Sequence, residues 1–506
     1  MATVAPKRPG VFVNETLLPL NNTAEVGGVS NAVFVGTNAA GGPTTPTLVT
    51  SWTQFTNLFG GFGSGADYLP FSVYEFFNNG GSACYVVRAV TASAVAASLT
   101  LKDTQGTPAD VLKITAVAPG KWGNSLQVSV VTSSVPGSFD FVVSNGAVTE
   151  RFSAVSLDPT SSRNVVAVVN SPYAGSQFVR LAYLGPNAWT SANSPDAQSD
   201  AALASGTDGT GSADLVAAAK QVSDLNGTFD VNLPGVNTNS VINPLVQWAK
   251  DQGNVFLVVD GVAGAVGDSA ATNAAAQAAL LAGGAALTLD STVALYGPWV
   301  IADDPASNFS GAQRLLPPGG FVLGQYARTD VLRGVQKPAA GTTAVIRGAL
   351  GPQFKYSATD LDTLNSAGVN ALRVIPGAGT CIFGARTLSV GMPDRYLNIR
   401  RSLIVIKNAL IDLTRFAIFE ENDSDLRALI EDLVSQYLRT QWANGVLAGD
   451  TETSAFYVKC DDENNPPASV ANGFVNISVG VSPQTPAEFI VFNIGQTISG
   501  PSVDEA

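Results

Sequence analysis

The sequence contains no histidine and few charged residues of either sign. Of its 506 residues, 27 are Lys or Arg and 40 are Asp or Glu, 13% in all, where an average soluble domain has roughly 25%. Without imidazole there is no Ser-His-Asp or Cys-His catalysis, no His-ligated zinc and no histidine pH switch. The surface must therefore be neutral and polar, or buried against partner molecules.

The net charge, the few cysteines and the lack of long apolar segments limit the partners and the compartment that the protein can have. The net charge of −13 disfavours nucleic acid as a partner, because phosphate binding needs clustered Lys and Arg. Cys84, Cys381 and Cys460 are far apart and match no metal spacing, so we expect buried free thiols and a reducing compartment during assembly. The N-terminus has no apolar signal segment, and Ser269–Leu289 is too polar to span a bilayer, so we expect neither secretion nor membrane insertion.

The order of helix-like and strand-like segments along the chain predicts an α+β multidomain fold with extended terminal arms. Two α/β segments form a middle domain, a β-rich segment interrupts them as a sandwich or small barrel, and an α+β domain follows. The predicted segments are an N-terminal arm (1–22), the middle domain (23–91 and 206–345), the β-rich insert (92–205), the C-terminal domain (346–482) and a C-terminal arm (483–506).

Hydrophobic periodicity predicts the individual elements. We expect strands at Ala32–Val35, Cys84–Arg88, Leu112–Val117, Leu126–Val131, Phe139–Val143, Val165–Val169, Phe178–Tyr183, Val255–Asp260, Val293–Ile301, Ala455–Cys460, Phe474–Val481 and Phe489–Ile494. We expect helices at Tyr68–Phe77, Val241–Lys250, Ala270–Ala282 and Asn398–Glu420, and another that starts at Asp423-Ser424. That last helix should turn its leucines, Ile430 and Tyr437 inward, and Arg427, Glu431, Asp432 and Arg439 outward.

Three polar motifs are candidates for chemical sites. The run Gly206–Gly211 lacks the Lys of a phosphate loop and is interpreted as a flexible interdomain turn. Asp303 and Asp304 end a strand, where carboxylates can be catalytic, but neighbouring residues point apart and a loop or capping role fits better. The acidic run Asp461–Asn465 matches no calcium loop and is interpreted as a solvated turn. We therefore assign no catalytic residue, metal or cofactor.

Arginines concentrate in the last third of the chain. On an acidic protein they would form a distinct positive cluster, or they are ordinary surface residues, and the sequence leaves both interpretations open. The residues are Arg347, Arg373, Arg386, Arg395, Arg400 and Arg401.

Two apolar strands lie beside flexible segments near the chain ends. Val11, Phe12 and Val13 stand in a proline-rich arm too short to fold alone, and Phe489, Ile490, Val491 and Phe492 follow two prolines. An exposed apolar strand invites pairing with another chain. The alternative is that both strands close their own domain.

Several motifs together resemble the contractile tail sheath proteins of myophages and phage-like contractile injection systems. The matches fall at both ends and in the middle of the chain, in the order expected of that family, whereas the segment 92–205 carries no match. They are Pro9–Glu15, Ala32–Thr37, Gly42–Phe55, Phe76–Arg88, Tyr296–Trp299, Leu316–Gly320, Tyr326–Asp330, Gly334–Ala339, Gly368–Leu372, Asn398–Arg401 and Pro486–Ile490.

The resemblance implies a structural subunit without enzymatic activity. Subunits would stack as hexameric rings around an inner tube protein, with baseplate and sheath terminator proteins as further partners. The N-terminal and C-terminal arms would complete a β-sheet on neighbouring copies, and the insert would face outward. Contraction from a metastable extended state would drive the tube through a target envelope. Assembly would take place in the bacterial cytoplasm, as part of a phage tail or phage-like particle.

For a protein of this kind, we expect the helix from Asp423 to Trp442 to form the surface near the inner tube, with Arg427 and Arg439 as charge contacts. Two other functions stay open from the sequence alone. One is a surface or receptor-binding protein built on the β-rich segment 92–205. The other is a glycoside hydrolase that uses Asp303 or Asp304 as a carboxylate.

Overall fold

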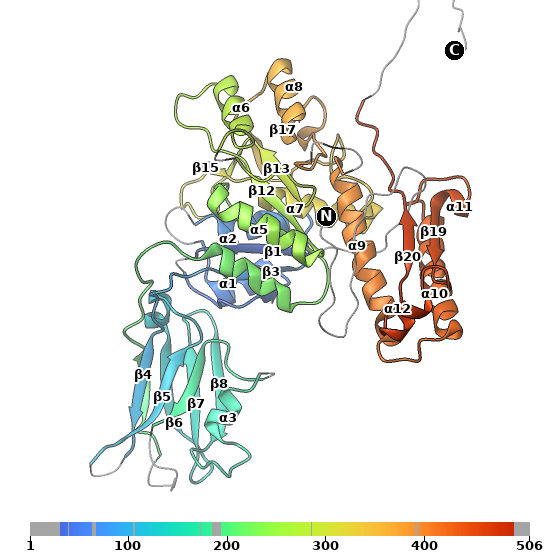
Figure 1. The fold of residues 1–506 in the computed structure, drawn as a ribbon. Coiled ribbons are helices and arrows are strands. Elements are labelled where there is room, and N and C mark those ends of the chain that lie inside the picture. Colours follow the sequence, from blue (N-terminus) through green and yellow to red (C-terminus); the bar gives the residue numbers. More distant parts are fainter. Residues whose placement is uncertain are drawn as a thin grey trace, which may run out of the picture. The chain divides into compact units, whose positions relative to one another are not determined.

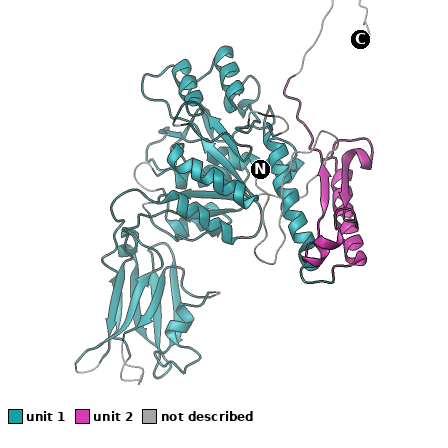
Figure 2. Ribbon diagram, viewed as in Figure 1, with its two compact units in different colours: residues 1–16, 26–421 teal, residues 17–25, 422–506 magenta. Residues whose placement is uncertain are grey.

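The computed structural model describes residues 31–489, except 39, 63–66, 105–106, 173, 185–193, 285, 390 and 392–393. These residues form two compact units, the first ending at Glu421 and the second beginning at Asn422 (Figure 1; Figure 2). The α+β multidomain fold with α/β core and β-rich insert is confirmed. The N-terminal arm and most of the C-terminal arm lie outside the described residues, and the predicted domain boundaries stay predictions.

The first unit is built around an eight-stranded sheet whose central strands are parallel. Its outer strands, β18 and β2, run antiparallel to their neighbours. In sheet order the strands are β18 (Gly379–Ile382), β17 (Val369–Ile375), β13 (Val293–Gly297), β12 (Val255–Asp260), β11 (Phe229–Asn232), β1 (Asn31–Gly36), β3 (Cys84–Arg88) and β2 (Thr47–Val49).

Both faces of this sheet are apolar and covered. In β1, Phe34 joins the core on one face, whereas Val33 and Val35 join the core on the other. Since successive strand residues point to opposite faces, such a strand needs helices on both sides. Helices α1 (Trp52–Phe59), α2 (Leu69–Asn78) and α7 (Gly319–Arg333) supply the first core, and α4 (Leu215–Lys220), α5 (Asn239–Gln252), α6 (Ala270–Ala279) and α8 (Ala358–Ala367) supply the second.

The predicted strand Val293–Ile301 is two strands in the structure. β13 ends at Gly297, and β14 (Val300–Asp303) forms a separate antiparallel sheet with β15 (Gln313–Leu316) and β16 (Ala349–Pro352). The prediction was wrong because it passed over Pro298, whose nitrogen has no hydrogen to donate and therefore interrupts a ladder.

The β-rich insert has two antiparallel sheets that share one core. One prediction within it was wrong: Val165–Val169 is a short helix, α3, and not a strand. The Asn164 side chain accepts the N–H of Ala167, and the buried Val165 and Val169 stand one helical turn apart. The strands are β10 (Gln198–Ala202), β6 (Gln127–Thr132), β7 (Phe139–Ser144) and β8 (Thr149–Val155) in one sheet, and β4 (Ser98–Lys102), β5 (Asp110–Ala116) and β9 (Val179–Tyr183) in the other.

The chain enters and leaves the insert at one place. Val95 and Thr207 exchange two backbone hydrogen bonds of 2.9 and 3.0 Å. The hydroxyl of Thr91 donates to the Asp208 carbonyl at 2.7 Å, and the Asp208 carboxylate accepts the N–H of Lys121 at 2.9 Å. The run Gly206–Gly211, which contains Asp208, therefore holds the two ends of the insert together through hydrogen bonds.

Arg401 is buried in the first unit between two carboxylates. Its guanidinium contacts Asp230 and Asp330, each at 2.6 Å, and lies 4.3 Å from the centre of the Tyr326 ring. Burial alone would lower the pKa of Arg401, but the two aspartates outweigh it and hold the pKa well above its ordinary value. With Arg400 also only 5% exposed, this pair is neither a surface pair nor part of an exposed positive cluster.

The long helix before the second unit is shorter than predicted. α9 (Leu397–Thr414) ends in a single 3-10 turn, Arg415–Ala417, so the predicted helix Asn398–Glu420 loses its last residues. Phe419 has a φ of +72°, a left-handed conformation that an α-helix excludes. The hydrophobic spacing alone did not reveal this end.

The structure shows the state of the three cysteines and the character of the helices. Cys84, Cys381 and Cys460 are buried free thiols, as expected. Among the described residues, no helix combines the length and hydropathy that crossing a bilayer requires.

Candidate interaction surface on the C-terminal unit

The second unit is organised by one long helix, α10 (Ser424–Ala443). Asp423 caps it by accepting the N–H of Leu426 at 2.8 Å. Leu426, Ile430, Val434 and Leu438, spaced by four, form the buried stripe. The predicted facing was wrong at two positions, because Leu429 is 48% exposed whereas Arg427 is only 8% exposed.

A two-stranded antiparallel sheet packs on this helix (Figure 1). β19 (Phe456–Lys459) and β20 (Ser478–Val481) pair so that Phe456 faces Val481 and Lys459 faces Ser478. Both lie within the predicted strands, and the short helices α11 (Glu452–Ala455) and α12 (Pro467–Ala471) flank them. Within the described residues no third strand joins this sheet, so the outer edge of each strand has no strand paired to it there.

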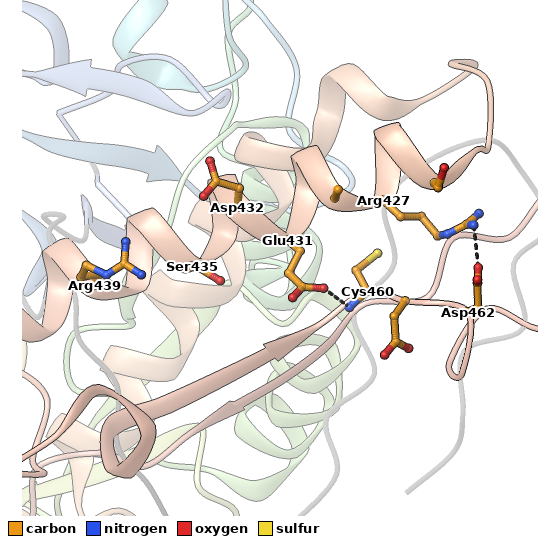
Figure 3. A pocket seen from close by; sticks show the side chains of 10 residues that line it. Arg427, Glu431, Asp432, Ser435, Arg439, Cys460 and Asp462 are labelled. Carbon is orange, nitrogen blue, oxygen red and sulfur yellow. Dashed lines mark hydrogen bonds and ion pairs between the residues drawn. The ribbon is translucent and has the colours of Figure 1, made fainter.

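A groove of about 470 Å³ runs along α10 beside the end of β19 (Figure 3). Arg427, Glu431, Ser435 and Arg439 line its helical wall at a regular spacing of four. Residues three or four apart share one face of a helix, so this series forms a continuous polar wall. The remaining lining residues are Ser424, Ala428, Asp432, Cys460, Asp461 and Asp462.

The groove is acidic overall, with two arginines against four carboxylates. At one end the Arg427 guanidinium is held by Asp462 at 2.8 Å. In the middle, the Glu431 carboxylate accepts the backbone N–H of Cys460 at 2.9 Å. Burial, reinforced by the Glu431 carboxylate, raises the pKa of the Cys460 thiol to about 11, so the thiol stays protonated at neutral pH.

The other end of the groove is formed by Arg439, whose side chain is 53% exposed. Its guanidinium forms two hydrogen bonds with Glu452, at 2.7 and 3.1 Å. These bonds to Glu452 raise the pKa of Arg439 above its ordinary value. Both arginines named from the sequence therefore line this groove, and both already have an acidic partner within the second unit.

The acidic run after β19 is an ordered turn. The Asp461 carboxylate accepts the N–H of Glu463 at 3.0 Å. The Asn465 amide donates to the backbone carbonyls of Asp461 and Asn476, at 3.0 and 2.9 Å. Within the described part of the chain, no group of three Cys, Asp or Glu side chains is placed to hold a metal ion.

The strand residues named as arm contacts are almost all outside the described residues. Val11, Phe12, Val13, Ile490, Val491 and Phe492 belong to this group, whereas Phe489 is described, is 71% exposed and has no regular secondary structure. The sequence interpretation missed Glu431, Asp432, Asp461 and Asp462 as members of one surface. The spacing of four from Arg427 to Arg439 was a signal for its helical wall.

Of the two carboxylates considered for hydrolysis, Asp304 has structural partners. Asp304 binds Arg314 at 3.0 Å and accepts the N–H of Ala306 at 3.0 Å. This is the loop-stabilising role that the sequence favoured over catalysis. Asp303 is the last residue of β14.

Two other acids in the first unit have shifted pKa values. Burial raises the pKa of Glu75, in α2, to about 7, with a smaller rise from Asp303 against a hydrogen bond from Asn78. Burial likewise raises the pKa of Asp260 to about 6, although the N–H groups of Gly235 and Gly319 bind its carboxylate. Asp260 accepts backbone N–H groups and Glu75 accepts the side-chain amide of Asn78, as expected of buried polar groups in a core.

Two segments of the chain match models of a known protein family. Residues 209–388 match the phage tail sheath protein central domain and residues 393–497 match the phage tail sheath C-terminal domain, together more than half of the chain. The chain therefore belongs to the phage tail sheath family.

Individual relatives match over part of their length. The tail sheath protein of Vibrio phage KVP40 is 27% identical over 193 residues, which are 37% of this chain and 28% of that protein. The tail sheath protein of Enterobacteria phage T4 is 25% identical over 199 residues, 39% of this chain and 29% of that protein. The matched segment thus spans less than a third of either relative.

A solved structure extends the likeness of fold over nearly the whole chain. The sheath complex of the extracellular contractile injection system PVC, in its contracted state, superposes with a TM-score of 0.59 at 19% identity. The match covers 98% of this chain and 99% of that chain.

Proposed function

We propose that this chain is a structural, non-enzymatic subunit of a contractile sheath. Copies would polymerise as stacked hexameric rings around an inner tube protein, with a baseplate and a sheath terminator at the ends. The sheath would be part of a phage tail or phage-like particle assembled in the bacterial cytoplasm. Family membership and the two-stranded sheet with open edges, β19–β20, carry this proposal.

The terminal strands link neighbouring copies in this proposal. Val11–Val13 of one copy and Phe489–Phe492 of another would add strands to the β19–β20 sheet. Strand addition satisfies main-chain donors and acceptors of an open edge and holds its register through alternate side chains. Such linked subunits can repack as rigid bodies during contraction while the hydrogen-bonded links persist.

Helix α10 is proposed to face the inner tube. Arg439 supports this idea best, because its exposed guanidinium can contact an acidic partner while Glu452 orients it. Arg427 would act through Asp462, whose carboxylate is 89% exposed. Charge reversal at both arginines should abolish co-sedimentation with the tube, and unchanged co-assembly would contradict this contact.

Electron microscopy of negatively stained, purified protein tests the proposed function directly. Hollow cylinders are the expected result, and discrete particles at all concentrations would contradict it. Deletion of residues 1–20 should prevent cylinders and leave a folded chain with an unchanged far-ultraviolet circular dichroism spectrum. Cylinders formed by the deleted chain would show that the N-terminal strand is not the link.

A further inference from the structure

An exposed phenylalanine followed by two glutamates stands just before α10, and a small basic pocket of the first unit is complementary to it. We infer that Phe419, Glu420 and Glu421 of one copy bind this pocket on a second copy of the chain. The inference rests on the self-assembly proposed above and assigns one contact between copies to named side chains. Neither the terminal arms nor the groove along α10 takes part in it.

A turn at the end of α9 holds the Phe419 ring in solvent. The N–H of Glu420 donates to the carbonyl of Ala417 at 3.3 Å, and Phe419 has a φ of +72°. A bulky residue rarely adopts this left-handed conformation, yet here it leaves the phenylalanine 88% exposed. Strained backbone of this kind clusters at ligand clamps and other functional segments, so the turn is a candidate contact with a partner.

The two residues after Phe419 give the turn a negative charge. Glu420 and Glu421 are exposed, and neither forms an ion pair within the described residues. Arg415, which precedes the turn, is held by Asp412 at 2.8 Å and does not neutralise them. Of the exposed phenylalanines that the structure describes, no other is followed by two acids; the others are Phe309, Phe383, Phe416, Phe474 and Phe489.

A small pocket lies among the segment after β16, helix α8 and strand β17. It has a volume of about 50 Å³, which admits the edge of one aromatic ring and excludes a strand or a helix. Its charged lining residues are Lys355 and Arg373, so we call it the basic pocket. The other lining residues are apolar or aromatic, namely Pro352, Phe354, Tyr356, Leu361, Leu372 and Val374.

The two cations of the basic pocket have no acidic partner in their own chain as far as it is described. Neither Lys355 nor Arg373 forms an ion pair there, although the sequence has 40 acids against 27 bases. Asp360, which adjoins the lining residue Leu361, is occupied by Ser357, whose N–H and hydroxyl it accepts at 2.9 and 2.7 Å. Carboxylates of another molecule can therefore pair with both cations.

An aromatic ring already lies beside one of these cations. The Arg373 guanidinium is 4.9 Å from the centre of the Phe383 ring, and Phe383 is 43% exposed. A planar guanidinium can stack on aromatic rings at both of its faces. The Phe419 ring would take the second face while its edge enters the pocket, and the glutamates that follow would pair with the two cations.

The turn and the basic pocket are separate surfaces of one chain. Because Phe419 is exposed, it does not occupy the pocket of its own copy. Each copy can therefore insert its turn into one neighbour and receive the turn of another. Heterologous contacts of this kind generate rings or open helices, and both occur in the proposed stack.

Cross-linking between two full-length variants tests the contact directly. Glu420→Cys and Lys355→Cys, mixed and oxidised, should give a disulfide-linked pair of chains, whereas each variant alone should stay unlinked. The native thiols are buried and do not compete. Asp450→Cys mixed with Lys355→Cys is the matched control, because Asp450 is exposed and lies outside the turn. Linkage supports the contact even if no cylinders form, and its absence, or equal linkage in the control, overturns the inference.

Phe419→Gly separates a role in binding from a role in stability. Glycine adopts a positive φ without strain, so the variant should keep or raise the thermal midpoint of the chain. Loss of the ring should nevertheless raise the critical concentration for polymerisation, measured by sedimentation, about tenfold. Phe309→Gly removes another ring, 82% exposed and without adjacent acids, and should leave assembly unchanged. Assembly of Phe419→Gly at the wild-type concentration overturns the inference.

Exchange of charges tests the pairing of the glutamates with the two cations. Lys355→Glu with Arg373→Glu should raise the critical concentration about tenfold, and so should Glu420→Lys with Glu421→Lys, because attraction becomes repulsion. The quadruple variant restores opposite charges and should return to within about threefold of the wild type. Thermal denaturation checks that each variant is folded. A quadruple variant no better than either double variant overturns the inference and leaves the sheath proposal intact.

Discussion

At the scale of single residues, Arg401 shows how strongly one buried charge is held. It joins α9 to Asp230 in β11 and Asp330 in α7. Arg401→Met would leave two buried carboxylates without their cation, which costs about 3–5 kcal/mol of unfolding free energy. Urea denaturation of the full chain, followed by fluorescence, measures the loss.

A charge-free core provides the control for that variant. Arg401→Met combined with Asp230→Asn and Asp330→Asn removes the uncompensated charges, and we expect it to recover much of the lost stability. A triple variant that is as unstable as Arg401→Met would show that packing, and not charge, dominates at this position.

Glu75 gives the first unit a pH response without histidine. Its folded-state pKa of about 7 lies above the ordinary value of 4.5, so the folded chain binds a proton that the unfolded chain releases. The stability that protonated Glu75 contributes is therefore fully present below about pH 4.5. This contribution is lost as the pH rises toward 7, and the loss is on the order of 3 kcal/mol. Glu75→Gln should flatten this decline in thermal denaturation between pH 5 and 8, and an equally steep decline would contradict it.

Such residue-scale partners could not be predicted from the sequence. Arg401 is 171 residues from Asp230 and 71 from Asp330, so no local spacing reports their contact. Arg427 was predicted to point outward because it is charged, yet Asp462 lies close enough to hold it beneath the acidic turn. By contrast, the three thiols were predicted correctly, since free cysteine is among the residue types that are most often buried.

At the scale of elements, the cap of α10 determines how firmly the groove wall is held. Asp423→Ala removes the side-chain acceptor for the Leu426 N–H and should cost about 1 kcal/mol. Hydrogen exchange of amides in the first turn of α10 should quicken, and Asp450→Ala is the matched control without a cap. Equal protection in both variants would contradict a capping role.

Elements with strong periodicity were predictable, and their exceptions have local causes. β3 and β12 lie at the predicted residues because uninterrupted apolar runs fit strands covered on both faces. Val165–Val169 has the same composition but follows an asparagine cap and becomes helical. Here the side-chain acceptor of Asn164 outweighs the strand preference of valine.

At the scale of the whole molecule, the insert should be separable from the sheet that carries it. Replacement of residues 96–204 by a short Gly-Ser linker keeps the Val95 and Thr207 positions close and should leave the eight-stranded sheet folded. Circular dichroism and a single thermal transition test this. A control that removes β17 and β18 should aggregate, and aggregation of the insert deletion as well would contradict its independence.

The order of the eight strands in the sheet could not be predicted from the sequence. Patterns predict that Ala32–Val35 and Val255–Asp260 are strands, but β1 and β12 are separated in the sheet by β11, which the pattern did not mark. β11 has only four residues, Phe229–Asn232, and two of them are polar, so its burial becomes clear only through its neighbours. Long-range pairing, unlike periodicity, is a property of the assembled chain.

The bridge between Val95 and Thr207 also bears on how this lineage can evolve. A segment whose two ends meet at one hydrogen-bonded place can lengthen or be exchanged while the register of the sheet behind it is kept. The length of the insert can therefore vary without a matching change in the strands of the sheet.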